Sequence, residues 1–331
     1  MLNLDQKDRK LLFYLSQNAR FSQTQLSRKI NLSKNAVKYR ISRLQKEGII
    51  QNFSTIVNLG AIYLDTFTLL LRFNQDVYTN PEMMEFFKNH PFANWAASLA
   101  GQWDLFIEFV YQDTPHGHEL IQEILFKYGS SIQEYKTAFS YEALRVEHFL
   151  PEICAGIKVD EVAPVTRTKE KFKLDQTDAK ILTLLNQDSS QPLIKIAQNA
   201  NLSIDIVRYR IKQLLKNKII IKLSTEISLS KLGYTEYLYT LNFQNCSPSR
   251  LGQLKKNISL NQNVTYAFVD IFTSRLVFVC AFKDPQEIDA LSRKIRTEYP
   301  EIIKEQEYFI IKENILFNLF PQGLVSLIGK S

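Results

Sequence analysis

The sequence predicts an α+β fold made of two tandem copies, each a (winged) helix-turn-helix domain followed by a βαββαβ ferredoxin-like domain. Two observations lead to this prediction. Two helical patterns are separated by only a few residues near residue 32, and strand and helix patterns alternate after them. The whole series then recurs 170 residues further along the chain. A repeat of that length is a domain pair rather than a solenoid unit, so we expect the copies to form a pseudo-dimer.

The first helix-turn-helix motif is expected within residues 22–50. Ser22 with Gln25 three residues later forms a capping box, which starts the first helix of the motif. Ser33 is suited to cap the second helix, whose inward face carries apolar residues at helical spacing: Val37, Ile41 and Leu44. Gly48 then supplies the left-handed residue that ends this helix.

The duplication is visible as direct sequence identity. Residues 4–73 and 174–243 align without a gap and are identical at 24 of 70 positions. The segment LDQKDRKLL at Leu4 corresponds to LDQTDAKIL at Leu174, and Tyr39-Arg40-Ile41 corresponds to Tyr209-Arg210-Ile211. The second motif is therefore expected to fold as the first does.

A βαββαβ pattern follows each helix-turn-helix motif. In the first copy, strands are expected at residues 66–74, 93–100, 104–112 and 132–144, and helices at 81–90 and 118–128. In the second copy, strands are expected at 236–244, 264–270, 275–282 and 302–312, and helices at 249–258 and 286–299. This order of elements is that of a ferredoxin-like unit.

These patterns divide the chain into five parts. Residues 1–60 and 174–230 are expected to form the two helix-turn-helix domains. Residues 61–151 and 231–331 are expected to form the two ferredoxin-like domains, and residues 152–173 the linker between the copies.

Charge is distributed unevenly between these parts. Residues 4–60 carry 11 Lys and Arg against 3 Asp and Glu, and residues 174–230 carry 8 against 5. Residues 61–151 carry 5 against 12. The positive charge therefore belongs to the helix-turn-helix parts, and the acidic part is not expected to bind a polyanion.

The composition excludes several classes of protein. No apolar run approaches the length of a membrane span, and the first residues contain no hydrophobic targeting segment, so we expect a cytoplasmic protein without membrane contact. The three cysteines, Cys154, Cys246 and Cys280, are far apart and lack metal-binding spacing. We expect buried thiols, with no metal site and no cofactor.

The candidate DNA-binding residues lie on the outward face of the second helix of each motif, where amides, hydroxyls and cations suit base edges and phosphates. In the first copy they are Ser33, Lys34, Asn35, Lys38, Tyr39, Arg40, Ser42 and Arg43. In the second copy they are Ser203, Asp205, Arg208, Tyr209, Arg210 and Lys212. Lys38 and Arg43 are favoured because we expect them to project from the exposed face. Arg40 and Arg210 are equally suited to a salt bridge with Asp8 or Asp178.

Three motifs resemble those of the Lrp/AsnC (feast/famine) family of transcriptional regulators. They are LDQKDRKLL, the stretch LSKNAVKYRISRLQKEGIIQNFS, and AGQWDL, in which Gly101 and Asp104 match the family's Gly-x-x-Asp turn. The resemblance implies a transcriptional regulator that binds double-stranded DNA and has no enzymatic activity. It also implies further self-association and small effectors, often amino acids, near Gly101 and Asp104.

The second copy departs from the family pattern at two places. Lys218 stands where the first copy has Gly48, at a cost of about 1 kcal/mol if the left-handed conformation is kept. Phe272 and Arg275 fall near the positions of Gly101 and Asp104. We therefore expect any effector response to be weak, absent or confined to the first copy, and the two DNA half-sites to differ.

An enzyme with the same architecture is the alternative. The siroheme decarboxylases have subunits of this two-domain type, sometimes fused in one chain, and their chemistry needs histidines and cations around a tetrapyrrole. The corresponding segments NWAASLAGQWD and NVTYAFVDIFT contain no histidine. The sequence therefore favours the regulator.

Overall fold

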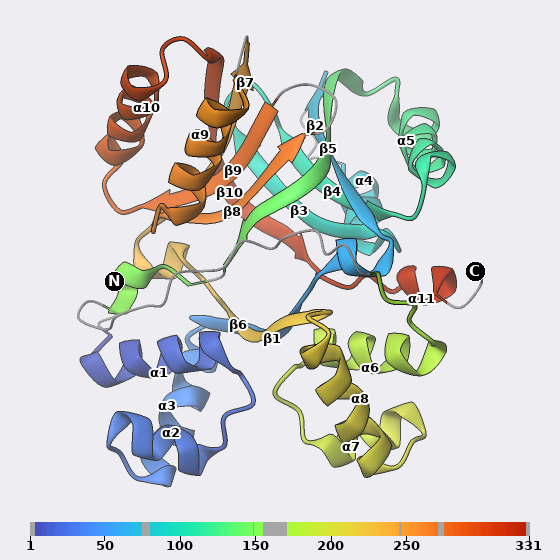
Figure 1. The fold of residues 1–331 in the computed structure, drawn as a ribbon, viewed down its shortest axis with the longest axis vertical. Coiled ribbons are helices and arrows are strands. Elements are labelled where there is room, and N and C mark those ends of the chain that lie inside the picture. The colour runs from blue at the N-terminus through green and yellow to red at the C-terminus, as the bar shows by residue number, and fades with distance from the viewer. Residues whose placement is uncertain are drawn as a thin grey trace.

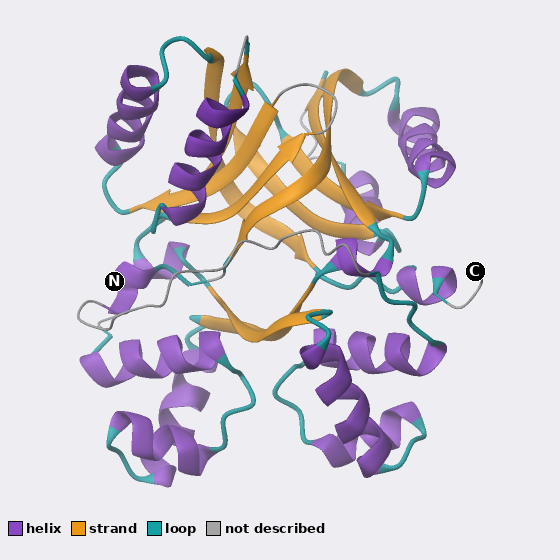
Figure 2. Ribbon diagram, viewed as in Figure 1, coloured by secondary structure: helices purple, strands orange, loops and turns teal. Residues whose placement is uncertain are grey.

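Two helical heads lie on the same side of one closed β-sheet (Figures 1 and 2). The computed structural model describes residues 4–74, 80–147, 149–154, 171–244, 247–270 and 275–328. The α+β class and the tandem arrangement predicted from the sequence are confirmed. Among the described helices, none has the length and hydrophobicity of a membrane-spanning segment.

The first head consists of α1 (Gln6–Gln17), α2 (Gln23–Ile30) and α3 (Lys34–Lys46). The predicted capping box of Ser22 and Gln25 is present at the start of α2, and the Ser33 hydroxyl accepts a hydrogen bond from the Ala36 amide at the start of α3. Helix α1 begins with a further capping box, formed by Asp5 and Asp8. These caps fix where each helix begins, and Val37 and Leu44 turn α3 toward the core.

The second head repeats this arrangement with α6 (Gln176–Gln187), α7 (Leu193–Ala200) and α8 (Ile204–Lys216). Helix α7 has no side-chain cap, because Pro192 replaces the serine. Lys218 adopts a φ of 55°, close to the 68° of Gly48. The second head therefore keeps the left-handed helix end without a glycine.

The two heads are interlocked through a two-stranded antiparallel ribbon of β1 (Ile50–Val57) and β6 (Ile220–Ile227), one strand from each copy. Each head also forms a backbone hydrogen bond with the ribbon strand of the other copy. The Ala19 amide donates to the Leu223 carbonyl at 2.8 Å, and the Ser189 amide donates to the Phe53 carbonyl at 2.8 Å. The heads therefore form one body rather than two independent domains.

The closed sheet has eight strands in the order β10-β3-β4-β2-β5-β8-β9-β7. The first copy contributes β2 (Asp65–Phe73), β3 (Ala93–Ala100), β4 (Leu105–Tyr111) and β5 (Ile132–Val146). The second contributes β7 (Thr235–Phe243), β8 (Val264–Asp270), β9 (Arg275–Phe282) and β10 (Ile303–Phe317). Pairing of β5 with β8 and of β10 with β3 joins the copies at both edges. Each half has the ferredoxin-like strand order, and their union leaves no free edge.

Longer helices lie outside the closed sheet (Figure 2). They are α4 (Pro81–Asn89) and α5 (Thr114–Tyr128) in the first copy, and α9 (Pro248–Leu260) and α10 (Gln286–Glu298) in the second. Three short elements lie between the parts: η1 (Leu59–Ile62), η3 (Pro151–Cys154) and η4 (Ser230–Leu232). Helix α11 (Leu324–Leu327) follows β10 and packs against α6. The expected tether, residues 152–173, lies mostly outside the described residues.

Two predicted boundaries were wrong by four residues or more. Helix α5 begins at Thr114 rather than His118, because the Asp113 side chain caps it by accepting from the His116 amide. Strand β10 continues to Phe317 rather than ending at residue 312, because its second half pairs with β3 of the other copy. The paired residues are far apart in the chain, so no local sequence pattern predicts this pairing.

Candidate nucleic-acid interface

Helix α3 presents a polar face to solvent. Residues Ser33, Lys34, Asn35, Lys38, Tyr39 and Ser42 are all exposed, and Tyr39 is 68% exposed. Their hydroxyls, amide and ammonium groups are free of the head's core because Val37 and Leu44 occupy it. The face therefore offers what base edges and phosphates require, and contact of these residues with DNA stays a prediction.

Arg40 and Arg43 are held differently. Asp8 is 1% exposed and lies below them, accepting from Arg40 Nη1 and from Arg43 Nη2, each at 2.6 Å. Arg40 also pairs with Asp5 at 2.7 Å. Burial would lower the pKa of Arg40, but Asp8 and Asp5 raise that pKa above its ordinary value. The expectation that Arg43 projects from the exposed face was wrong, because the buried Asp8 carboxylate draws it inward.

Helix α8 presents a different face. Ser203, Asp205, Tyr209 and Lys212 are exposed, and Arg208 is exposed but paired with Asp205. Two isoleucines also reach the surface at the start of the helix: Ile204 at 36% and Ile206 at 44% exposure. Beneath it, Arg210 pairs with Asp175 at 2.9 Å and with Asp178 at 3.3 Å. The second head therefore offers fewer free cations and more apolar surface than the first.

The turn at Gly101 and Asp104 has a clear structural role. Gly101 is exposed and has a φ of 128°, a conformation that favours glycine. The Asp104 carboxylate accepts from the Phe73 amide at 2.8 Å, and the Asp104 amide donates to the Leu71 carbonyl at 3.0 Å. Asp104 thus ties the turn to β2.

The corresponding turn of the second copy, with Phe272, lies outside the described residues. Arg275 follows it and donates to Asn242 Oδ1 at 2.7 Å. Arg275 therefore ties this end of the sheet to β7 with a cation, where the first copy uses the Asp104 carboxylate.

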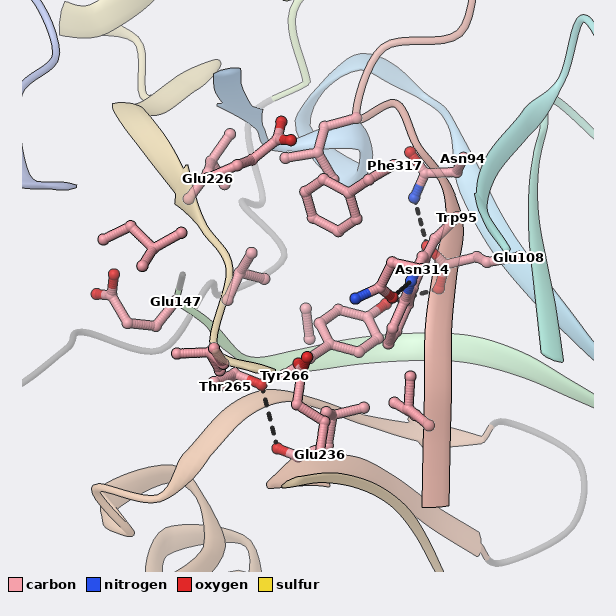
Figure 3. Close-up of a pocket in the computed structure, with 18 of the residues that line it drawn as sticks. Asn94, Trp95, Glu108, Glu147, Glu226, Glu236, Thr265, Tyr266, Asn314 and Phe317 are labelled. Atoms are coloured by element: carbon pink, nitrogen blue, oxygen red, sulfur yellow. Dashed lines mark hydrogen bonds between the residues drawn. The ribbon is translucent and has the colours of Figure 1, made fainter. Parts of the chain in front are cut away.

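A chamber of about 680 Å³ separates the closed sheet from the β1–β6 ribbon (Figure 3). Ile56, Val57, Glu226 and Ile227 line it from the ribbon, and strands of the closed sheet supply most of the other walls. Figure 3 shows Trp95, Tyr266 and Phe317 pointing into this space. The chamber draws on both copies and was not foreseen from the sequence.

Comparison with known proteins agrees with the head geometry. Residues 4–51 match the family model of winged helix-turn-helix DNA-binding domains. An uncharacterized HTH-type transcriptional regulator of Pyrococcus horikoshii is 36% identical over 107 residues, which are 32% of this chain and 71% of that one. The chain belongs to the Lrp/AsnC family of transcriptional regulators.

A more distant member supports the same assignment. An HTH-type transcriptional regulator of Mycobacterium tuberculosis is 27% identical over 124 residues, which are 38% of this chain and 84% of that one. The relatives correspond to one copy of the repeat, whereas this Lrp/AsnC chain contains two. It is thus a DNA-binding transcriptional regulator of the helix-turn-helix type, with both heads in one polypeptide.

The tandem fold also has a solved counterpart. The siroheme decarboxylase NirDL superimposes with a TM-score of 0.63 over 98% of this chain and 97% of that one, at 11% identity. This likeness establishes the common fold. An Lrp/AsnC regulator and an enzyme can therefore share the whole architecture, and side-chain chemistry must separate them.

Two features of the site escaped sequence reasoning. The pairing of Asp8 with Arg43 joins residues of separate helices, so it depends on how α1 packs on α3. The chamber carboxylates were also missed. Two residues could have indicated the chamber, because a carboxylate is unusual in a closed sheet. They are Glu108, inside the otherwise apolar strand LFIEFVY, and Glu236, between Thr235 and Tyr237.

Proposed function

We propose that this chain is a sequence-specific regulator that acts as a single-chain pseudo-dimer on two non-identical DNA half-sites. The observation that supports this most directly is the difference between the outward faces of α3 and α8. Lys34 and Asn35 near the start of α3 can recognise guanine and adenine. Asp205 at the same place in α8 accepts only from cytosine among the bases and repels phosphate.

The interlocked heads favour simultaneous binding. Hydrogen bonds across the β1–β6 ribbon fix one head against the other, so both recognition helices belong to one rigid body. Such an arrangement suits half-sites about one helical turn apart, or a multiple of that distance. Lysine contacts with phosphates would supply most of the affinity, and base contacts would supply the selectivity.

The salt dependence of DNA binding tests this proposal. Fluorescence anisotropy with a random-sequence duplex would compare the wild type with the Lys34→Ala/Lys38→Ala variant. Each lost phosphate contact lowers the slope of log K against log salt by about 0.9, so this variant should lose up to about 1.8. The Arg208→Ala/Lys212→Ala variant should lose less, because Arg208 is already paired with Asp205.

A matched control removes two cations elsewhere. Lys88 and Lys256 are exposed on α4 and α9, outside the closed sheet. The Lys88→Ala/Lys256→Ala variant should keep the wild-type slope. Equal losses from all three double variants would show that binding follows net charge and not the recognition helices.

The enzyme reading is opposed by the chemistry of the chamber. A NirDL structure contains an iron-uroporphyrin III analogue, and tetrapyrroles of that type carry many carboxylates. Here six carboxylates and two ammonium groups line the chamber, and no described lining residue is a histidine. Titration with iron uroporphyrin III, followed by the Soret band, tests the alternative. A saturable shift at one equivalent per chain would favour an enzyme.

We further propose that an amino-acid response, where present, uses only the turn of the first copy. Gly101 leaves room at an exposed turn, and Asp104 provides a carboxylate, whereas Arg275 has the opposite charge. Calorimetry with the twenty amino acids would show one site per chain, and Asp104→Asn should weaken it while keeping an acceptor for the Phe73 amide. Two equivalent sites would contradict this, and light scattering of the same samples reports further self-association.

A further inference from the structure

The DNA-binding heads make no use of the chamber between the ribbon and the closed sheet. At about 680 Å³ it has the size of a small-molecule site, for which roughly 300–1,000 Å³ is typical. Its walls combine apolar and aromatic side chains with a few polar groups, which is the usual composition of a ligand pocket. The lining therefore indicates what kind of molecule fits.

The charged lining is predominantly acidic. The carboxylates that face the chamber are Asp65, Glu108, Glu147, Glu226, Glu236 and Glu313. Against them stand Lys231 and Lys312, and Lys231 Nζ is already bound to the Glu47 carbonyl at 2.7 Å. An anion entering this space would meet more repulsion than attraction, and a cation the reverse.

Several of these carboxylates already have partners within the protein. Glu147 accepts from Lys222 at 2.7 Å, and Glu108 accepts from the Tyr266 hydroxyl at 2.7 Å and from the Asn94 amide group. Glu226 also has partners, because its carboxylate forms hydrogen bonds with the side chains of Ser54 and Asn52. Glu236 is different. Burial raises its pKa to about 7, and it has no hydrogen-bond or ion-pair partner among the residues that the structure describes.

One wall of the chamber is aromatic. Trp95 lies at the centre of this wall, with ring centroids 5.8 Å from Tyr266 and 6.2 Å from Phe317. Asn314 holds the indole in place by accepting from Trp95 Nε1 at 2.7 Å. Beside it, Asn94 is 5% exposed and donates its amide group to Glu108. Aromatic faces suit an organic cation.

We propose that the chamber binds a small organic cation, in which an ammonium group is joined to an apolar or aromatic body that carries no carboxylate. The ammonium group binds Glu236, and the body lies against the wall of Trp95, Tyr266 and Phe317. A free amino acid is disfavoured because its own carboxylate would face this acidic lining.

The position of the two carboxylates connects the chamber to the heads. Glu226 belongs to β6, which is half of the ribbon that joins the heads, whereas Glu236 belongs to β7 of the closed sheet. The chamber lies between these two elements, so a molecule that fills it contacts both and fixes the ribbon against the sheet. This consequence rests on the proposed DNA-binding function, but binding of the cation to the chamber does not.

Calorimetry with three matched pairs of compounds tests the binding. The pairs are phenethylamine with phenylalanine, tryptamine with tryptophan, and tyramine with tyrosine, which differ only by the carboxylate. At pH 8 at least one amine should bind the full chain with a Kd below about 1 mM, and its amino acid at least tenfold more weakly. No binding by any amine, or equal binding within a pair, would overturn the proposal.

Variants locate the site. Glu236→Gln should weaken the amine at least tenfold, whereas Glu287→Gln, which removes the same charge from an exposed position on α10, should not. Affinity should rise between pH 6 and pH 8 as Glu236 ionises, and Glu236→Gln should reduce this rise. Thermal melting of each variant confirms folding, and unchanged affinity in Glu236→Gln would place the amine elsewhere.

DNA binding gives a separate readout. If the ribbon transmits the effect, an amine concentration that saturates the wild type changes the DNA affinity of the wild type and not that of Glu236→Gln. Failure to bind any DNA would refute the proposed function while leaving the calorimetry intact. DNA binding that is identical with and without a bound amine would refute the coupling.

Discussion

At the scale of single residues, Asp8 determines how many cations α3 offers to a ligand. Its buried carboxylate accepts from both Arg40 and Arg43, so the free positive charge of the recognition helix comes from lysines. In the second head Gln213 replaces Arg43, and Asp178 holds only Arg210, at 3.3 Å. The two carboxylates therefore occupy equivalent sequence positions, but Asp8 forms ion pairs with two arginines and Asp178 with one.

We predict that Asp8→Asn destabilises the protein more than Asp178→Asn. Removing a buried carboxylate from two arginines should cost about 3 kcal/mol in the free energy of unfolding, because Arg43 and Arg40 both lose the buried Asp8 and only Arg40 keeps Asp5. Asp178→Asn should cost less, since it breaks one longer ion pair. Urea denaturation followed by circular dichroism measures both, and equal losses would refute the unequal roles.

Lys218 is the next single-residue test. We predict that Lys218→Gly raises the free energy of unfolding by about 0.5–1 kcal/mol, because glycine adopts a positive φ without steric cost. The matched change Gly48→Ala in the first head should lower it by a similar amount. Denaturation midpoints of the two variants should move in opposite directions, and a stabilising Gly48→Ala would contradict this account.

The Glu236 carboxyl makes stability depend on pH. Its folded pKa of about 7 lies above the ordinary value of 4.5, so the folded state binds the proton more tightly than the unfolded state. Stability is therefore lost as the pH rises from about 4.5 to 7. We predict that Glu236→Gln is more stable than the wild type at pH 8 and nearly equal at pH 4.5. A difference of the same size at both pH values would contradict this.

At the scale of elements, local signals were predictable and long-range pairing was not. The caps at Ser22 and Ser33 and the helix end at Gly48 depend on neighbouring residues, so the sequence located α2 and α3 well. The ribbon joins residues as distant as Phe53 and Thr225, and the sheet joins β10 to β3. No local periodicity specifies such partners, and the chamber that they enclose was missed for the same reason.

Cross-copy pairing predicts that the two halves remain together after the chain is cut. A protease site placed within residues 155–170 would leave intact the β1–β6, β5–β8 and β3–β10 pairings. After cleavage, size-exclusion chromatography under native conditions should show one particle with the mass of the uncut chain. Separation of the halves without denaturant would show that these pairings are weaker than their extent suggests.

At the scale of the whole molecule, one chain holds two unlike recognition helices in a fixed relation. Duplication allowed α3 and α8 to diverge, which identical subunits of a homodimer cannot do. The exposure of the candidate DNA-binding residues was partly predictable, because exposure follows helical phase, and their contact with DNA stays a prediction. The exposure of Arg43 was overestimated, because helical periodicity does not show that Asp8 of another helix lies beneath it.

Selection of bound fragments from random DNA, using the full chain, tests the central claim most directly. The account predicts an imperfect palindrome bound by one chain, with half-sites about one helical turn apart or a multiple of it. Lys34→Ala/Asn35→Ala should relax only one half of the recovered consensus. A perfectly symmetric consensus, or relaxation of both halves by that variant, would contradict the account.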